Sequence, residues 1–181
     1  MPEEIEIDIK EQIEVFEQES PWNRYLALTT AIIAVVAAIA SLLSGSYSNA
    51  SLLEKNNAVL LQSKASDQWN YYQAKGVKKN IADSFYTQFQ TPSFKDQSGK
   101  YQKEQVDIQK QAEEFQREAE AGNHRSELLL EKHHKTAYAV TFFQIAIAFA
   151  ALSALMKKRQ FFYLSLILAA LGFGFLLFGL I

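Results

Sequence analysis

The sequence predicts an all-α membrane protein with three transmembrane helices and a long, coiled-coil-like, antiparallel helical hairpin outside the membrane. Two observations predict this fold class: three apolar stretches without a charged residue, and a long intervening region with little proline or glycine. The stretches are residues 25–48, 137–156 and 161–181. Each holds about 20 residues or more, enough for a helix to cross the roughly 30 Å hydrocarbon core. Because backbone amides in lipid need internal partners, isolated spans indicate helices rather than a barrel.

Residues 1–24 form an acidic arm, in which eight acidic residues outnumber Lys10 and Arg24. Isoleucines and Phe16 would share one face if the arm were helical, whereas the alternation from Ile5 to Ile9 would suit a strand. An acidic amphipathic segment matches anionic lipid poorly. We therefore expect residues 1–20, called the acidic segment below, to bind a cytoplasmic protein partner.

The first span, residues 25–48, is predicted to be a membrane anchor. Cleavage at Ala38-Ile39-Ala40 as a signal peptide is the alternative, but the chain lacks the basic leading region that signal peptides carry. Small residues recur along this span at a 4-3 spacing and would let another helix approach closely. They are Ala27, Ala31, Ala34, Ala38, Ser41 and Gly45. We expect transmembrane packing along this stripe, although alanine is also common in spans that do not self-associate.

Residues 49–136 are predicted to form the hairpin, with its tip at residues 91–99, where turn-forming residues are dense. On the returning arm, apolar, small and polar residues follow the 4-3 spacing of a coiled-coil seam. From this seam we expect assembly contacts by Ile108, Phe115, Leu129 and His133. On the outgoing arm, the apolar residues drift around the helix, which indicates contact with more than one neighbour.

Aromatic residues stand among polar ones in the stretch "ASDQWNYYQAKGVKKN", residues 65–80. On a helix, Trp69 and Tyr72 share a face that Gly76 continues, and Tyr71 lies on the adjacent face. Trp and Tyr bury large areas while their polar tips seek partners, and glycine admits a close neighbour. We interpret this stretch as an interaction patch rather than a small-molecule site.

Four segments carry a resemblance to a known family: residues 23–45, 52–81, 131–155 and 157–172, with "DQWNYYQAK" (67–75) the most specific part. Together they resemble the bacterial membrane proteins of the domain of unknown function family DUF4337. The resemblance implies an integral membrane protein of about three spans with a helical extramembrane hairpin. It implies no reaction.

A basic turn, residues 157–160, separates the second and third spans and carries Lys157, Lys158 and Arg159. Short basic loops stay in the cytoplasm. We therefore expect a multi-pass protein of the bacterial inner membrane, with a cytoplasmic N-terminus and with residues 49–136 on the periplasmic or extracellular side.

Several kinds of chemistry have no support in the sequence. The chain has no cysteine and a net charge of −2, which argues against disulfides and nucleic-acid binding. His133 and His134 would point about 100° apart on a helix, a poor arrangement for one metal ion. We expect no cofactor and no enzyme activity. The predicted function is a homo-oligomeric scaffold or adaptor in contact with membrane lipids; the alternative is a channel or transport-accessory subunit with Gln144 or Thr29 facing a pore.

Overall fold

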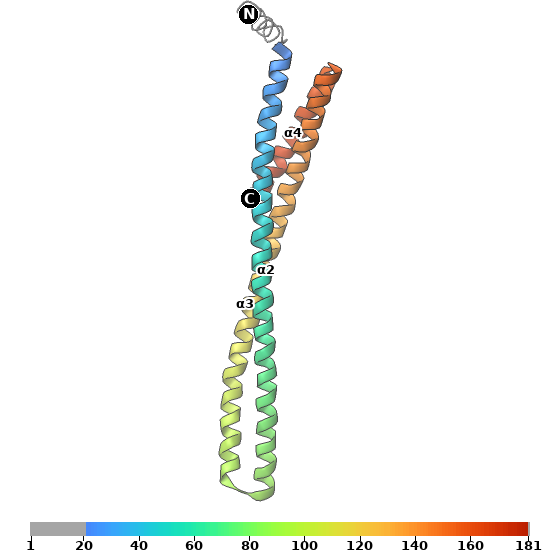
Figure 1. Ribbon diagram of the computed structural model, residues 1–181. Coiled ribbons are helices and arrows are strands. Elements are labelled where there is room, and N and C mark those ends of the chain that lie inside the picture. Colours follow the sequence, from blue (N-terminus) through green and yellow to red (C-terminus); the bar gives the residue numbers. More distant parts are fainter. Residues whose placement is uncertain (1–20, 181) are drawn as a thin grey trace, which may run out of the picture. The chain divides into compact units, whose positions relative to one another are not determined.

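The computed structural model describes residues 21–180, which form three α-helices and no strand (Figure 1). The helices are α2 (Pro21–Phe89), α3 (Pro92–Met156) and α4 (Arg159–Leu180). The predicted all-helical class is confirmed for these residues. The acidic segment and Ile181 lie outside the described residues. The first helix begins at Pro21, four residues before the predicted span, because proline suits the first position of a helix, where its missing amide hydrogen is not needed.

The connections between helices are shorter than the sequence predicted. Only Gln90 and Thr91 separate α2 from α3, whereas the tip was expected to cover residues 91–99. Gln90 adopts a left-handed conformation, with φ of 55°, and its amide donates to the Tyr86 carbonyl at 2.8 Å. A left-handed residue is a common way to end a helix. Pro92 then starts α3, so the turn-forming residues after it belong to the first helical turns. Likewise, Lys157 has a φ of 52° and Arg159 already starts α4.

The chain divides into two compact units, and the long helices α2 and α3 contribute to both. The three-helix unit contains residues 21–47 and 131–180 among the described residues, and the two-helix unit contains residues 48–130.

Close helix contacts hold the core of the three-helix unit together. The core comprises Ile33, Ala37, Ala40, Ala139, Phe143, Ala146 and Leu176. A Cβ atom added to Gly172 on α4 would lie 3.0 Å from the Phe143 ring and 3.2 Å from the Ala139 carbonyl oxygen. The Ser165 hydroxyl donates to the Ala146 carbonyl at 2.7 Å. Small residues on α4 therefore set its distance from α3.

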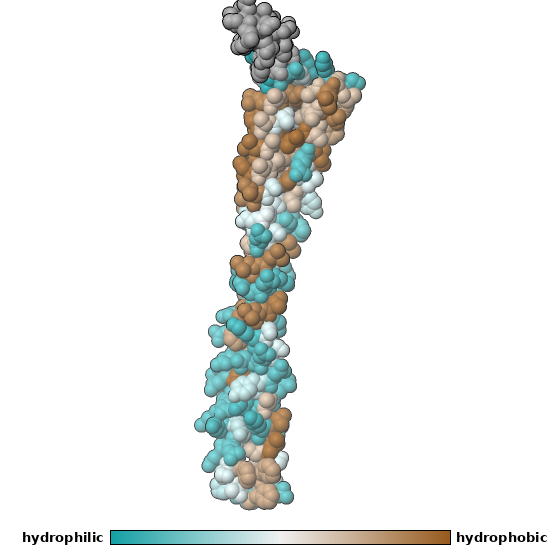
Figure 2. Space-filling model, in the orientation of Figure 1, coloured by the Kyte–Doolittle hydropathy of each residue, from teal (hydrophilic) through white to brown (hydrophobic). Residues whose placement is uncertain are grey.

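The outer surface of the three-helix unit is largely apolar (Figure 2). Each of the three helices contains a window that is long and apolar enough to cross a membrane, and at most 28% of the residues in any of these windows are buried. A protein surrounded by water rarely exposes so large an apolar surface, whereas lipid tails solvate one.

In the two-helix unit, α2 and α3 pack through small side chains. The buried small residues of this contact include Ser51, Ala58 and Ala65 on α2, and Ala112, Ala119, Gly122 and Ser126 on α3. Contacts join Ser51 to Ser126, the Tyr72 carbonyl to Gln105, and Phe85 to Phe94, so the two segments run in opposite directions (Figure 1). Members of the α2 set are seven residues apart, the repeat of a helix that keeps one face toward a partner.

Candidate functional site

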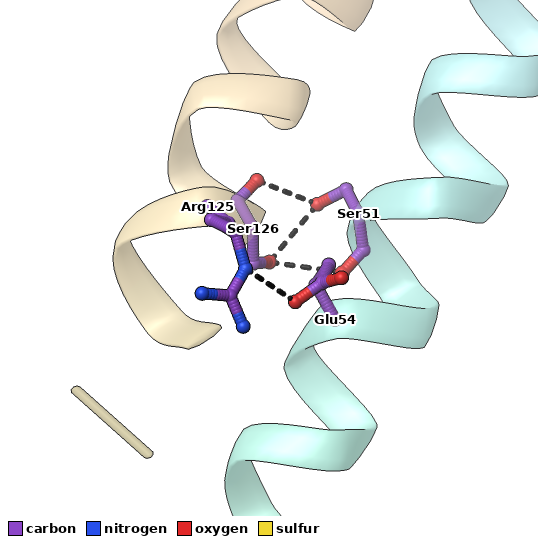
Figure 3. A network of polar contacts seen from close by, with 4 residues as sticks. All are labelled: Ser51, Glu54, Arg125 and Ser126. Atoms are coloured by element: carbon purple, nitrogen blue, oxygen red, sulfur yellow. Dashed lines mark hydrogen bonds and ion pairs between the residues drawn. The ribbon is translucent and has the colours of Figure 1, made fainter. Parts of the chain in front are cut away.

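Two serines form a reciprocal contact between α2 and α3 in the two-helix unit (Figure 3). The Ser51 hydroxyl donates to the Ser126 carbonyl at 2.9 Å, and the Ser126 hydroxyl donates to the Ser51 carbonyl at 2.9 Å. The two hydroxyl oxygens lie 3.1 Å apart. Both serines are buried, so each hydroxyl needs a partner, and each has one. The contact links two backbones directly and fixes the register of the helices.

Charged and polar side chains surround this serine contact. The Arg125 Nε donates to the Glu54 carboxylate at 3.0 Å (Figure 3), and Lys55 Nζ donates to the Asn123 side-chain oxygen at 2.9 Å. A Cβ atom on Gly122 would lie 3.2 Å from the Ala58 Cβ. Gly122 and Ser126 fall on the 4-3 spacing of the returning arm, because they lie seven and eleven residues after Phe115. Sequence reasoning missed Ser51. The signal that could have found it is the seven-residue spacing of Ser51, Ala58 and Ala65.

The predicted aromatic patch lies in the two-helix unit and connects its two helices. The Trp69 and Tyr72 rings meet edge to face, with centroids 5.6 Å apart. The Lys75 ammonium lies 5.1 Å from the Tyr71 ring centroid and 5.4 Å from that of Tyr101 on α3. Lys75 also forms an ion pair with Glu104 on α3. The patch thus combines cation–π contacts with an ion pair across the helix interface.

Gly76 provides space for a side chain of α3. A Cβ atom there would lie 2.8 Å from Gln105 Nε2, which donates to the Tyr72 carbonyl at 3.2 Å. From the sequence we expected Gly76 to admit a close neighbour, and the neighbour in the structure is the side-chain amide of Gln105. The glycine therefore serves a hydrogen bond within the chain.

Titration behaviour at the patch is that of a structural ion pair. The pKa of Glu104 is lowered, first by its hydrogen bond with Lys75, and the pKa of Lys75 is raised, first by its hydrogen bond with Glu104. Both shifts move the pKa values of these two side chains away from neutral pH, so Glu104 and Lys75 are both charged at pH 7. A general acid or base would need the opposite shift.

The residues that we predicted for assembly contacts differ in how far they are exposed. Ile108 is buried, and Phe115 and Leu129 are half-buried, all in the two-helix unit. The Lys64 ammonium lies 5.7 Å from the Phe115 ring centroid, so Phe115 also contacts α2 of its own chain. In the aromatic patch, Tyr71 is 49% exposed, whereas Trp69, Tyr72 and Gly76 are half-buried.

His133 lies in the three-helix unit and bonds to α2. Its Nδ1 is 2.9 Å from the Ser44 carbonyl oxygen and 3.0 Å from the Ser44 hydroxyl. Since a carbonyl only accepts, Nδ1 carries the hydrogen in that bond. The rings of His133 and His134 are 5.5 Å apart. Within residues 21–180, no three His, Cys, Asp or Glu residues are grouped so that they could hold a metal ion.

The predicted small-residue stripe of the first span faces outward in the three-helix unit. Ala27, Ala31, Ala34, Ala38, Ser41 and Gly45 are all exposed. A Cβ atom on Gly45 would meet no atom within 4 Å. The face one residue away, which includes Ile33, Ala37 and Ala40, makes the contacts within the chain. Part of the stripe lines an open groove of about 580 Å³, together with Ala150, Ala151 and Ala154.

The geometry defines a class of protein: an all-helical chain with three helices long and apolar enough to cross a membrane. The profile of the family described as domain of unknown function (DUF4337) matches residues 22–181, and the chain belongs to this family. The resemblance found in the sequence is thereby confirmed. No curated protein and no solved structure matches the chain.

Proposed function

We propose that this chain is a non-enzymatic integral membrane protein that assembles into a homo-oligomeric scaffold or adaptor. In this proposal the three apolar helices span the bacterial inner membrane, with the N-terminus and the basic turn in the cytoplasm. The two-helix unit is the extramembrane antiparallel hairpin, on the periplasmic or extracellular side. The exposed basic residues Lys157, Lys158 and Arg159 support this orientation, because short basic loops remain cytoplasmic.

The observation that carries the proposal is the position of the large apolar residues of α2. Leu52 and Val59 are seven residues apart, as are Leu53 and Leu60, so the four share one face of the helix. Each is at least 55% exposed. We call these four residues the leucine face. Since small residues make the contact between α2 and α3, the leucine face is free for another molecule.

The surroundings of the leucine face favour a helical surface of similar character as its partner. The nearest charged residues on α2, Glu54 and Lys55, already bind Arg125 and Asn123. The other neighbours include the uncharged Asn56, Asn57 and Ser63. They also include Lys64, whose ammonium lies 5.7 Å from the Phe115 ring centroid on α3. An apolar patch without free charge is typical of the centre of a protein interface. A second copy of the same face satisfies this requirement through a symmetric contact.

Disulfide cross-linking in native membranes tests the proposal, because the chain has no cysteine of its own. Leu53→Cys and Leu60→Cys are expected to cross-link two copies under mild oxidation. Gln73→Cys, an exposed position farther along the same helix, is the matched control and should remain uncrosslinked. Equal cross-linking at Gln73 and at the leucine face would contradict a specific contact.

A channel or transport-accessory role is the second candidate, and Gln144 is the observation in its favour. Gln144 is exposed on α3 in the three-helix unit, and within residues 21–180 its carboxamide has no hydrogen-bond partner. The Thr29 hydroxyl, by contrast, donates to the Tyr25 carbonyl at 2.8 Å and needs no pore water. Ion flux into liposomes that falls in Gln144→Leu and persists in Thr29→Val would support this candidate. Impermeable liposomes would contradict it.

A further inference from the structure

The basic turn lies beside the start of α2 in the three-helix unit. The Arg159 guanidinium is 4.9 Å from the centroid of the Trp22 ring, and the Trp22 and Phe162 rings meet edge to face at 5.1 Å. These contacts hold the point where the acidic segment joins the helix against the connection between α3 and α4. The start of α2, to which the acidic segment is attached, therefore lies next to the basic turn.

Charge on this chain is strongly segregated between the acidic segment and the remainder. Residues 1–20 hold eight of the 20 acidic residues but only one of the 18 basic residues. Lys157 and Lys158 are exposed, and neither forms an ion pair with a residue in the range 21–180. Within residues 21–180, Lys157 and Lys158 thus have no acidic partner, whereas the sequence of the acidic segment has an excess of negative charge.

The tether between the two is short. The acidic segment connects directly to Pro21, and Trp22, one residue later, contacts Arg159. Twenty residues reach roughly 30 Å if helical and about 66 Å if extended, well beyond the distance required. A short tether holds a binding partner at an effective concentration in the millimolar range. Even weak charge pairing is then sufficient to populate the contact.

We propose that the acidic segment docks on the basic turn of its own chain, with its carboxylates pairing with Lys157 and Lys158. Docking neutralises the turn and covers it against anionic lipid headgroups and against acidic surfaces of other proteins. A cytoplasmic partner of the acidic segment has to displace this contact, which makes the basic turn a competitor for that partner. The proposal depends on one chain only and is independent of the proposed homo-oligomer.

Electron-spin distance measurement tests the proposal on the full chain in vesicles of phosphatidylcholine, which carry no net charge. Gln12→Cys and Gln160→Cys place two labels, one in the acidic segment and one beside the turn, without altering any charge. Diluting the labelled chain with the unlabelled, cysteine-free wild type restricts the signal to distances within one chain. We expect a short and narrow distance population at low salt. Raising the salt from 0.1 M to 1 M shortens the Debye length from about 10 to 3 Å and should reduce this population at least twofold.

Charge variants identify the residues involved. Lys157→Gln with Lys158→Gln should abolish the short population, whereas neutralising the exposed Lys100 and Lys103 of the two-helix unit should preserve it. Lys157→Glu with Lys158→Glu should also abolish it, and adding Glu11→Lys with Glu14→Lys should restore it. A short population that survives neutralisation of the turn would overturn the proposal. A broad distance distribution in the wild type would also overturn the proposal. The basic turn would then be accessible to anionic headgroups.

Discussion

At the scale of single residues, the absence of a side chain determines how closely α2 and α3 approach. Gly122 faces Ala58 in the two-helix unit, and a Cβ atom there would already be 3.2 Å from the Ala58 Cβ. Gly99, in contrast, lies in the same helix with no atom within 4 Å of its added Cβ. The two glycines therefore form a matched pair, one inside the contact and one outside.

Gly122→Leu is expected to destabilise the two-helix unit by about 1–3 kcal/mol, because the added atoms overpack the contact. Gly99→Leu should stabilise it slightly, since leucine favours helix more than glycine by roughly 0.5–1 kcal/mol. Unfolding followed by Trp69 fluorescence in a Trp22→Phe background isolates this unit, because Trp22 lies in the other unit. Equal effects of both substitutions would show that no close contact exists at Gly122.

The Lys75–Glu104 ion pair makes the two-helix unit sensitive to acid. The pKa of Glu104 in the folded chain is below its ordinary value of 4.5, so the folded state binds this proton less readily than the unfolded state. The stabilising contribution is present above pH 4.5 and is lost as the pH falls through the folded pKa. Asp83, whose pKa is lowered first by its hydrogen bond with Ser98, acts in the same direction.

We therefore expect Trp69-detected stability to fall between pH 7 and pH 3, and Glu104→Gln to remove part of that fall. Asp107→Asn, a nearby exposed carboxylate on the same helix, is the control and should leave the pH dependence unchanged. An identical pH dependence in Glu104→Gln and the wild type would rule out the ion pair as a contributor.

At the scale of helices, the returning arm was predicted from sequence more successfully than the outgoing one. The 4-3 spacing on α3 contains buried Ile108, Ala112 and Ala119, because the small and apolar residues there do face α2. On α2, Leu53 and Leu60 dominate the apolar pattern but face outward, whereas Ser51 and Ala58 make the contact. Hydrophobicity shows which residues avoid water. A single sequence does not distinguish a contact within the chain from an exposed apolar face that binds another molecule.

Ile108→Asp is expected to disrupt the pairing of α2 with α3, since it buries a carboxylate without a partner at a position only 6% exposed. The loss should be at least about 2 kcal/mol of unfolding free energy, read from Trp69 fluorescence. Val106→Asp, two residues away and 49% exposed, is the control and should have little effect on this unit. The reverse order of effects would place the seam on the other face of α3.

At the scale of the whole molecule, the three apolar helices and the family were predictable from sequence, whereas the function was not. Long uncharged stretches have one common explanation, the bilayer, so residues 25–48, 137–156 and 161–181 were easily recognised. The aromatic stretch at residues 65–80 was ambiguous, because Trp69, Tyr72 and Gly76 suit contacts within a chain as well as contacts between chains. The contacts of Lys75 and Gln105 show how much of this stretch serves the chain itself.

The proposed orientation is tested with a membrane-impermeant maleimide on intact cells whose outer membrane has been made permeable. A cysteine at Asn57, exposed in the two-helix unit, is expected to react. A cysteine at Gln160, exposed beside the basic turn, should react only after the inner membrane is opened. Reaction at Gln160 in intact cells with protection of Asn57 would reverse the proposed topology.

The measurement that tests the central proposal most directly is the native mass of the full chain, extracted gently with its lipids. We predict one discrete homo-oligomer that dissociates in Leu53→Glu with Leu60→Glu, since charges on the leucine face should weaken the contact by at least tenfold in dissociation constant, about 1.4 kcal/mol. Gln73→Glu with Asn80→Glu adds the same charge at exposed positions and should leave the mass unchanged. A monomeric wild type, or an oligomer that survives charges on the leucine face, would contradict the account.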